Sequence, residues 1–363
     1  MKFLIKIGLL LLCTLEAVQP STAGTCAINK YNEDDIQDAV EKCTDITLNS
    51  ISVPPNVTLT LNLKQGTKLT FQGIVTWEFF EWKGPLLNIT GVDIEILGAP
   101  DHIIDVQGTL WWDTFGEHGG KIKPVFCVLH GLKNSVIHDL NVTNTPFYAI
   151  SIEDSDGVVV YDVYIDNKEG DTKGGHNTDG FNVWRSNNVT FTRISVFNQD
   201  DCIAVKSGTN VLVTDTYCHG GHGLSIGSVG GRDYNIVENV TISNSRNENA
   251  DNGIRIKTVY GATGLVRNIT YKDIVLKDIN NYGIFIDADY DLSTGEPTGV
   301  ASDGVPIEHI TLQNITGTVK KTGVNVYVIV KNATDWHCTG IDVTGGEQIK
   351  ECVGIPEESG LSC

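Results

Sequence analysis

The sequence predicts an all-β fold: a single-domain right-handed parallel β-helix (a solenoid) with a short N-terminal capping helix. Three observations lead to this prediction. Short runs of alternating β-branched residues are bounded by Asn, Asp and Gly, these runs recur at steps of 22 to 31 residues, and helical periodicity is nearly absent. A jelly roll or sandwich is the alternative, because the spacing of strands does not by itself establish parallel pairing.

Residues 1–23 are predicted to be a secretory signal peptide, which leaves residues 24–363 as the β-helix domain. Lys2 and Lys6 form the positive end of this peptide, "IGLLLLCTL" is its apolar stretch, and "STA" ends it on small residues. The apolar stretch is too short to span a bilayer, and no later segment reaches about 18 apolar residues. We therefore expect a secreted, extracellular protein with no membrane partner.

One segment near the N-terminus has helical periodicity. In "NEDDIQDAVEKC", the apolar residues Ile36, Ala39, Val40 and Cys43 fall on one helical face, and Asn32 is placed to act as the N-cap. A short amphipathic helix here would cover the open first coil of a solenoid.

The strand segments that follow resemble one another. Examples are "NSVIHDLNVTN", "DGVVVYDVYIDN", "NNVTFTRISVFN" and "TNVLVTDTYCHG". Each has a turn residue, then alternating β-branched residues, then another turn residue, as expected for one coil of a solenoid. We align the repeats on Val136, Val158, Val189, Val211, Ile269 and Ile310.

Cysteines and sequons agree with a secretory route. Nine cysteines are present, and eight remain once Cys13 leaves with the signal peptide, an even number that favours disulfides in a secreted chain. Zinc is not expected, because the chain has no CxxC pair. Eight Asn-x-Ser/Thr sequons indicate a glycoprotein, although "NVT" and "NIT" also suit a turn followed by a strand.

The formal net charge is −19 at pH 7. A surface this acidic repels nucleic acid and anionic membranes over long range, so neither is expected as a partner. The protein is expected to be a monomer.

Polar residues recur at the spacing of the coils. Asp200 comes 21 residues after Asp179, His222 follows 22 residues later, and Arg255 follows 33 residues after that. Residues one coil apart in a parallel β-helix stack at about 4.8 Å, so these groups should line one face. The i, i+2 pairs Asn177/Asp179 and Arg255/Lys257 should each point to one side of a strand.

This arrangement favours chemistry on an acidic sugar. Glycoside hydrolysis needs one protonated carboxyl group to assist the leaving group and one ionised carboxylate to activate water. Crowding should raise the pKa of at least one acid, and Arg and Lys can bind a uronic acid carboxylate. An isolated Asp-Asp pair is more often a solvated turn or a calcium ligand. The enzyme hypothesis therefore depends on the whole set of acids, imidazole and cations spaced by one coil.

The chain resembles the polygalacturonases, a family of pectin-degrading glycoside hydrolases, and its flanking sequences are closest to secreted endo-acting members. The four motifs of the family stand here as "NTD" at 177–179, "DD" at 200–201, "GHG" at 221–223 and "RIK" at 255–257. The resemblance implies a right-handed parallel β-helix and inverting hydrolysis of α-1,4 bonds between galacturonic acid units. It implies no cofactor and no catalytic metal.

The resemblance also implies roles for the acids and the imidazole. Asp200 is the expected general acid, since repulsion from Asp201 should help it keep a proton. Asp179 and Asp201 are expected to hold and activate the water, and His222 to tune the acid. A mildly acidic pH optimum is expected.

The remaining motif residues are implied to bind substrate. Arg255 and Lys257 would bind the substrate carboxylate, Tyr290 would contact the sugar near the cleavage point, and Asn177 would support the site. The expected partner is polygalacturonate or pectin, with a plant inhibitor protein as a further partner. "NTDGFN" departs from the family by carrying Asn182 where an Asp is usual, so one substrate-facing charge is expected to be missing.

The resemblance further implies three disulfides and leaves Cys127 and Cys338 over, with their pairing open. The implied pairs are Cys26–Cys43, Cys202–Cys218 and Cys352–Cys363.

Alternatives remain open at this point. The chain could act from chain ends, or on another pectin such as xylogalacturonan; "NTD" and "RIK" argue against rhamnogalacturonan. A pectate lyase would use calcium and release an unsaturated product. A catalytically silent pectin-binding homologue would bind oligogalacturonate without turnover. Endo against exo action depends on loops at the ends of the groove, which one sequence does not define.

Overall fold

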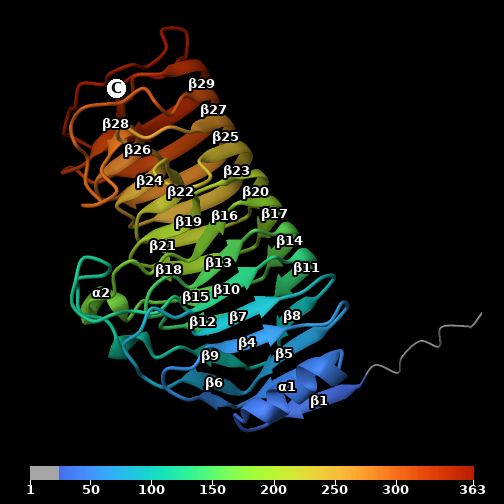
Figure 1. Ribbon diagram of the computed structural model, residues 1–363. Helices are drawn as coiled ribbons and strands as arrows, with labels where there is room; N and C mark the ends of the chain where they lie inside the picture. Colours follow the sequence, from blue (N-terminus) through green and yellow to red (C-terminus); the bar gives the residue numbers. More distant parts are fainter. Residues whose placement is uncertain (1–23) are drawn as a thin grey trace, which may run out of the picture.

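The computed structural model describes residues 24–363, so the predicted signal peptide over 1–23 lies outside the described residues. The strands stack along one axis from the N-terminal to the C-terminal end (Figure 1). Within this part of the chain, the paired strands of both sheets run parallel. This confirms the predicted parallel all-β stack and argues against the jelly roll, whose strands pair antiparallel.

Two sheets run the length of the stack. The ten-stranded sheet contains β4 (Leu59–Asn62), β7 (Leu87–Thr90), β10 (Cys127–His130), β13 (Ile150–Glu153), β16 (Phe181–Trp184), β19 (Asp201–Val205), β22 (Gly223–Val229), β24 (Asn252–Val259), β26 (Tyr282–Tyr290) and β28 (Val324–Ile329).

The nineteen-stranded sheet wraps the other sides of the coils. It contains β1 (Thr25–Ile28), β2 (Asp45–Asn49), β3 (Ser52–Val53), β5 (Lys68–Gln72), β6 (Ile74–Trp77), β8 (Glu95–Gly98), β9 (Ile103–Asp105), β11 (Lys133–His138), β12 (Asn141–Thr143), β14 (Asp156–Tyr161), β15 (Tyr164–Asp166), β17 (Ser186–Thr192), β18 (Ser195–Asn198), β20 (Gly208–Thr214), β21 (Tyr217–Gly220), β23 (Ile236–Glu248), β25 (Leu265–Ile279), β27 (Ile307–Val319) and β29 (Ala333–Thr344).

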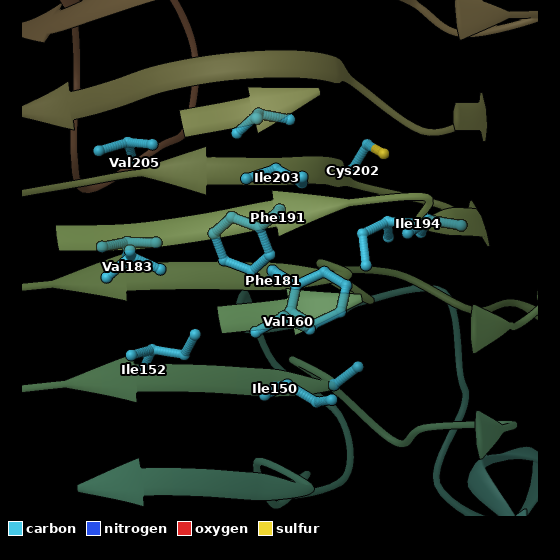
Figure 2. Close-up of a cluster of buried hydrophobic side chains, with 14 of the residues drawn as sticks. Ile150, Ile152, Val160, Phe181, Val183, Phe191, Ile194, Cys202, Ile203 and Val205 are labelled. Carbon is cyan, nitrogen blue, oxygen red and sulfur yellow. The ribbon is translucent and has the colours of Figure 1, made fainter. Parts of the chain in front are cut away.

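The core lies inside the coils, where like residues stack. Ile152, Val183 and Val205 occupy the same inward position on successive strands of the ten-stranded sheet (Figure 2). Phe181 meets Phe191 of the facing sheet edge-on, with ring centroids 5.1 Å apart. Because side chains alternate across a strand, these inward rows fill the interior and leave the outward rows of the ten-stranded sheet for a ligand.

Helix α1 (Glu33–Lys42) lies at the N-terminal end of the stack beside β1 (Figure 1). The Asn32 side chain accepts a hydrogen bond from the Asp35 amide at 2.9 Å, which confirms Asn32 as the N-cap. Ile36, Ala39 and Val40 are buried, as the periodicity predicts. The other helices are α2 (Gly170–Lys173) and the 3₁₀ turn η1 (Gly108–Leu110). None of the helices described over 24–363 has the length and apolar character needed to cross a membrane.

The predicted alignment of repeats is correct except at one step. Val158 pairs with Val189, and Val189 with Val211, as predicted. The residue that pairs with Val158 on the preceding coil is Ser135, not Val136. The prediction was wrong by one residue there because Ser135, although polar, is fully buried and takes the inward position that the apolar pattern assigned to its neighbour.

All three disulfides that the resemblance implied are formed. Cys127 and Cys338 are free and buried. Cys202–Cys218 joins the coil of β19 to the strand β21 that leads into the next coil, while the other two bonds close the ends of the described chain. The pairs are Cys26–Cys43, Cys202–Cys218 and Cys352–Cys363.

Candidate active site

Two adjoining hollows lie over the middle and the C-terminal part of the ten-stranded sheet. The first, called the central hollow, measures about 680 Å³ and is lined by Glu117, Tyr148, Asn177, Asp179, Asp200, Asp201, Lys206, Ser228, Arg232, Lys257, Tyr290 and Leu292. The second, called the C-terminal hollow, measures about 1600 Å³ and includes His222, Arg255, Tyr282, Phe285, Tyr327 and Lys350 in its lining. The sequence-predicted site residues are therefore gathered in two neighbouring depressions.

The acids and the imidazole occupy the same place in successive coils. Asp179, Asp200 and His222 lie in the turns that lead into β16, β19 and β22, and Asp201 is the first residue of β19. The coil spacing thus predicted their juxtaposition correctly. The prediction that Asn177 and Asp179 share a strand was wrong, because Asn177 adopts the left-handed conformation (φ 53°) of a turn, which asparagine tolerates well.

Asp200 is held by three hydrogen-bonding groups. Its Oδ1 lies 3.0 Å from His222 Nδ1 and accepts a hydrogen bond from the Asp201 amide at 2.6 Å. Its Oδ2 accepts from Asn177 Nδ2 at 3.0 Å. Asn177 is fixed in turn by the Glu117 amide, which donates to Asn177 Oδ1 at 2.9 Å. Asn177 therefore links the Asp200 carboxyl group to the backbone at Glu117.

The pKa of Asp200 is well below its ordinary value. Burial alone would raise it, but the charge and hydrogen bond of His222 and the charge of Lys257 outweigh burial. Burial likewise would lower the pKa of His222, yet the Asp200 carboxylate raises it above 6.5. Both shifts favour the ion pair, with the negative charge on Asp200 and the proton on the His222 imidazole.

Asp201 is paired with a different cation. Its Oδ2 accepts from Lys257 Nζ at 2.8 Å, and its Oδ1 accepts from Ser225 Oγ at 2.5 Å. Lys257 was expected to bind the substrate carboxylate. In this structure it is bonded to a candidate catalytic acid, although it still lines the central hollow.

Asp179 is the acid whose pKa is raised. Burial, followed by the charge of Asp200, raises the pKa of Asp179 to about 7, although Lys206 opposes the shift. Its Oδ2 lies 3.3 Å from Lys206 Nζ, and its buried Oδ1 has no hydrogen-bond partner among residues 24–363. The expectation that repulsion from Asp201 would leave the proton on Asp200 does not hold for the free protein, because His222 neutralises Asp200 instead.

The two residues of the "RIK" motif both lie on β24 but have different partners. Arg255 Nε is 3.4 Å from Asp287 Oδ1, and burial raises the pKa of Asp287 to about 6. Tyr290, at the end of β26, has its ring 5.5 Å from both the Arg255 guanidinium and Lys257 Nζ. The three residues form one cationic and aromatic wall where the two hollows meet.

Several site residues were not predicted from the sequence. Lys206 directly follows the inward-facing Val205 of β19, and Ser225 pairs in register with Arg255, so strand alternation could have placed both side chains on the outward face. Asn182, predicted as a missing charge, is fully buried on β16, and neither polar atom of its side chain has a partner among the described residues. The other unpredicted members are Tyr148, Arg232 and Asp287.

Asp200, Asp201 and His222 could also be considered as metal ligands, because each offers a ligand atom within 4.8 Å of the others. Their present bonds argue for ion pairing instead. His222 and Lys257 already supply positive charge to the two carboxylates, and a divalent cation would have to compete with the Lys257 ammonium for Asp201. The geometry fits an ion-pair network with room for a sugar.

Comparison with known proteins gives a consistent result. The sequence model described as "Glycosyl hydrolases family 28" matches residues 43–363. Endopolygalacturonase A of Aspergillus niger is 50% identical over 324 residues, covering 88% of this chain and 86% of the relative. Endopolygalacturonase 1 of Colletotrichum lindemuthianum is 49% identical over 322 residues, covering 88% of each chain.

Solved structures with the same architecture are also similar. Endopolygalacturonase I of Stereum purpureum, solved with two galacturonates, matches with a TM-score of 0.81 and 34% identity, covering 88% of this chain and 95% of that chain. An endo-xylogalacturonan hydrolase of Aspergillus tubingensis matches with a TM-score of 0.77, covering 94% of this chain and 98% of that one; at 21% identity it shares the fold alone.

Proposed function

The chain belongs to the glycosyl hydrolases of family 28, and from this premise we propose that it is an endo-polygalacturonase that hydrolyses α-1,4 bonds between galacturonic acid units. The observation that carries the proposal is the stack of Asp179, Asp200 and Asp201 in one hollow, flanked by Arg255 and Lys257. Hydrolysis of an acidic sugar chain needs one carboxyl group that donates a proton, one that accepts a proton, and cations that bind the sugar carboxylates.

In the proposed mechanism, the Asp200–His222 pair supplies the proton. The pair binds one proton between Asp200 Oδ1 and His222 Nδ1, which are 3.0 Å apart. An approaching glycosidic oxygen draws this proton through Asp200, which faces the central hollow, while Asn177 keeps the carboxyl group in place. His222 thus tunes the general acid and restores its proton.

Asp201 is the proposed base for the attacking water. Lys257 and Ser225 each donate a hydrogen bond to its carboxylate and hold it in place, as a base that must meet a water molecule requires. Asp179, which is largely neutral below its pKa of about 7, lines the same hollow and positions the water together with Asp201. Water delivered to the face opposite the leaving group gives an inverted product.

Arg255, Lys257 and Tyr290 are proposed to bind the sugar on the C-terminal side of the cleaved bond. The wall that they form has two cations and one aromatic ring, which suits a carboxylate on a pyranose ring. The C-terminal hollow continues from this wall and gives room for further units of a polymeric substrate.

The activity test is release of reducing sugar from polygalacturonate, with the anomeric form of the product followed by NMR. We expect an inverted product and mixed oligomers early in the reaction. Release of only monomer or dimer would instead mean exo action. An unsaturated product that disappears with a chelator would mean a lyase, and binding of oligogalacturonate without turnover would mean a silent homologue.

The residue test is Asp200→Asn. It should lower kcat by at least about a hundredfold, because the amide cannot donate the proton, while the thermal transition remains. Asp38→Asn is the matched control, since Asp38 is an exposed carboxylate on α1 that pairs only with Lys42. More than a few per cent of the wild-type rate in Asp200→Asn would refute its role as the acid.

We further propose the finer features that the sequence predicted. The coils are right-handed, α1 serves as the cap of the first coil, and residues 24–363 act as one catalytic domain. The protein is secreted and works as a monomer. Size-exclusion chromatography tests whether the protein is a monomer. A binding assay tests the further proposal that a plant inhibitor protein is a partner.

A further inference from the structure

Two cations in the central hollow are not used by the proposed mechanism. Lys206, which follows β19, and Arg232, in the loop after β22, both line this hollow. Each lies over an aromatic ring: Lys206 Nζ is 4.2 Å from the Tyr148 ring centroid and 5.2 Å from that of Trp184, and the Arg232 guanidinium is 4.8 Å from Trp184. The two cations therefore share the Trp184 ring as a common neighbour.

Neither cation has a full counter-charge. Arg232 donates only to Ser228 and to the carbonyl of Gly230, and no carboxylate of residues 24–363 lies within 4.0 Å of it. Lys206 pairs only with Asp179, an acid that is largely protonated below a pKa of about 7. Glu117 lines the same hollow without pairing to either cation. A buried or half-buried positive charge without a nearby anion destabilises the folded protein, unless a bound ligand supplies the anion.

The position of these cations matches the repeat of a polyanion. Trp184, Lys206 and Lys257 follow one another along the face of the ten-stranded sheet, on β16, after β19 and on β24. Because strands stack at about 4.8 Å, Lys206 lies about 10 Å nearer the N-terminal end than Lys257. A polyuronate carries a carboxylate on every unit, so cations spaced along the axis can bind successive units of one chain.

We propose that Lys206 and Arg232 form a second carboxylate-binding site, over Trp184, that takes a uronic acid unit on the N-terminal side of the cleaved bond. This site rests on the proposed function and complements the Arg255–Lys257 wall on the other side. Asn182 lies two residues before Trp184 on the same face of β16, and its unpartnered amide is a further polar group beside the site.

The test measures binding of hexagalacturonate and of its fully methyl-esterified form by calorimetry, in the Asp201→Asn background so that neither probe is cleaved. Arg232→Gln and Lys206→Met should each weaken binding of the charged probe by about tenfold, with little change for the ester. Arg232→Lys, which keeps the charge, should lose less. A merely structural role would weaken binding of both probes alike.

Arg193→Gln is the matched control. Arg193 also lies over an aromatic ring, Tyr161, and pairs with Asp162, but it is outside both hollows. Arg232→Gln is the sharper of the two variants, because Arg232 contacts none of the three acids, whereas Lys206 holds Asp179. Circular dichroism of each variant shows whether the fold is retained. If Arg232→Gln does not fold, Lys206→Met tests loss of the charge, and Arg232→Lys tests replacement of the guanidinium by an ammonium group.

Activity on polygalacturonate separates this inference from the proposed function. If the wild type releases reducing sugar but Arg232→Gln and Lys206→Met bind hexagalacturonate within twofold of Arg193→Gln, the second site is wrong and the proposed function stands. If the wild type releases none, the proposed function itself fails. If the second site exists, Arg232→Gln should also change which bond of end-labelled hexagalacturonate is cleaved.

Discussion

The three acids of the central hollow are all buried, but their partners differ. His222 draws the pKa of Asp200 down, whereas Asp179 faces a like charge on Asp200 and has only Lys206 to offset burial. Asp201 has the direct ammonium contact of Lys257. For Asp179 and Asp200, burial raises both pKa values, and the surrounding charges decide the net direction of each shift.

The Asp200–His222 pair predicts how activity depends on pH. The pKa of His222 is raised, so the protonated pair persists below that pKa and is lost as pH rises through it. We predict that kcat/KM falls on the alkaline side with a midpoint above 6.5. In His222→Gln, where no imidazole titrates, this midpoint should move and the maximal rate should fall. A wild-type profile that stays flat up to pH 9 would contradict the pair's role.

Asp179 predicts how stability depends on pH. Its ordinary pKa is 3.8 and its folded-state pKa is about 7, so the folded state binds the proton more tightly and stability declines between these values as pH rises. We predict that Asp179→Asn escapes this decline and gains up to about 4 kcal/mol relative to wild type at pH 8. Melting temperatures of both proteins at pH 4 and pH 8 measure the gain, and an equal difference at both pH values would count against it.

At the scale of the elements, each coil turns at residues with positive φ. Asn188, Asn210, Asn239 and Asn268 have φ between 51° and 57° and occupy the same position in successive coils. Asn210 Nδ2 donates to Asn187 Oδ1 at 2.8 Å, and Asn210 Oδ1 accepts from Asn239 Nδ2 at 3.1 Å. Three of these asparagines begin sequons, which explains why "NVT" and "NIT" recur as turn-and-strand sequences.

Asn210 allows a test of this turn column without removing a sequon. Asn210→Ala should destabilise the protein by about 1–3 kcal/mol, since alanine is strained at positive φ and cannot make the side-chain hydrogen bonds. Asn210→Gly loses the same hydrogen bonds but accepts the backbone conformation, so it should be less destabilising by about 1 kcal/mol. Chemical denaturation of both variants checks the difference, and equal losses would show that the conformation contributes nothing.

The whole molecule combines a strongly acidic net charge with four cations placed inside the groove. The net charge of −19 repels a polyanionic substrate at a distance, while Lys206, Arg232, Arg255 and Lys257 attract it at contact. The two effects have different ranges, so salt affects them differently. Screening removes the long-range repulsion first and weakens the short contacts only at higher salt.

This contrast predicts a maximum in the salt dependence of kcat/KM on polygalacturonate. The rate should rise between about 10 mM and 150 mM NaCl, as the Debye length falls from about 30 Å to about 8 Å, and then decline. Initial rates across a NaCl series at constant pH measure this. A steady decline from the lowest salt would mean that the groove's charge dominates at every distance.

The amino-acid sequence predicts the stacked strands and the coil-by-coil gathering of Asp179, Asp200 and His222, whereas the three disulfides were implied only by the family resemblance. The stacking and the gathering depend on local turn chemistry and on the length of one coil, both of which the order of residues expresses directly. The one-residue error at Val136 arose where a buried polar residue, Ser135, broke the apolar alternation on which the alignment relied.

The protonation of the site needed the packed structure. Lys206 reaches Asp179, Lys257 reaches Asp201, and His222 reaches Asp200 from separate coils. Whether a buried carboxyl group is charged depends on atoms a few ångströms away, and side chains that are 22 to 56 residues apart in the chain meet only after the coils have stacked. For the same reason, only the structure shows that Lys206 and Arg232 both lie over the ring of Trp184.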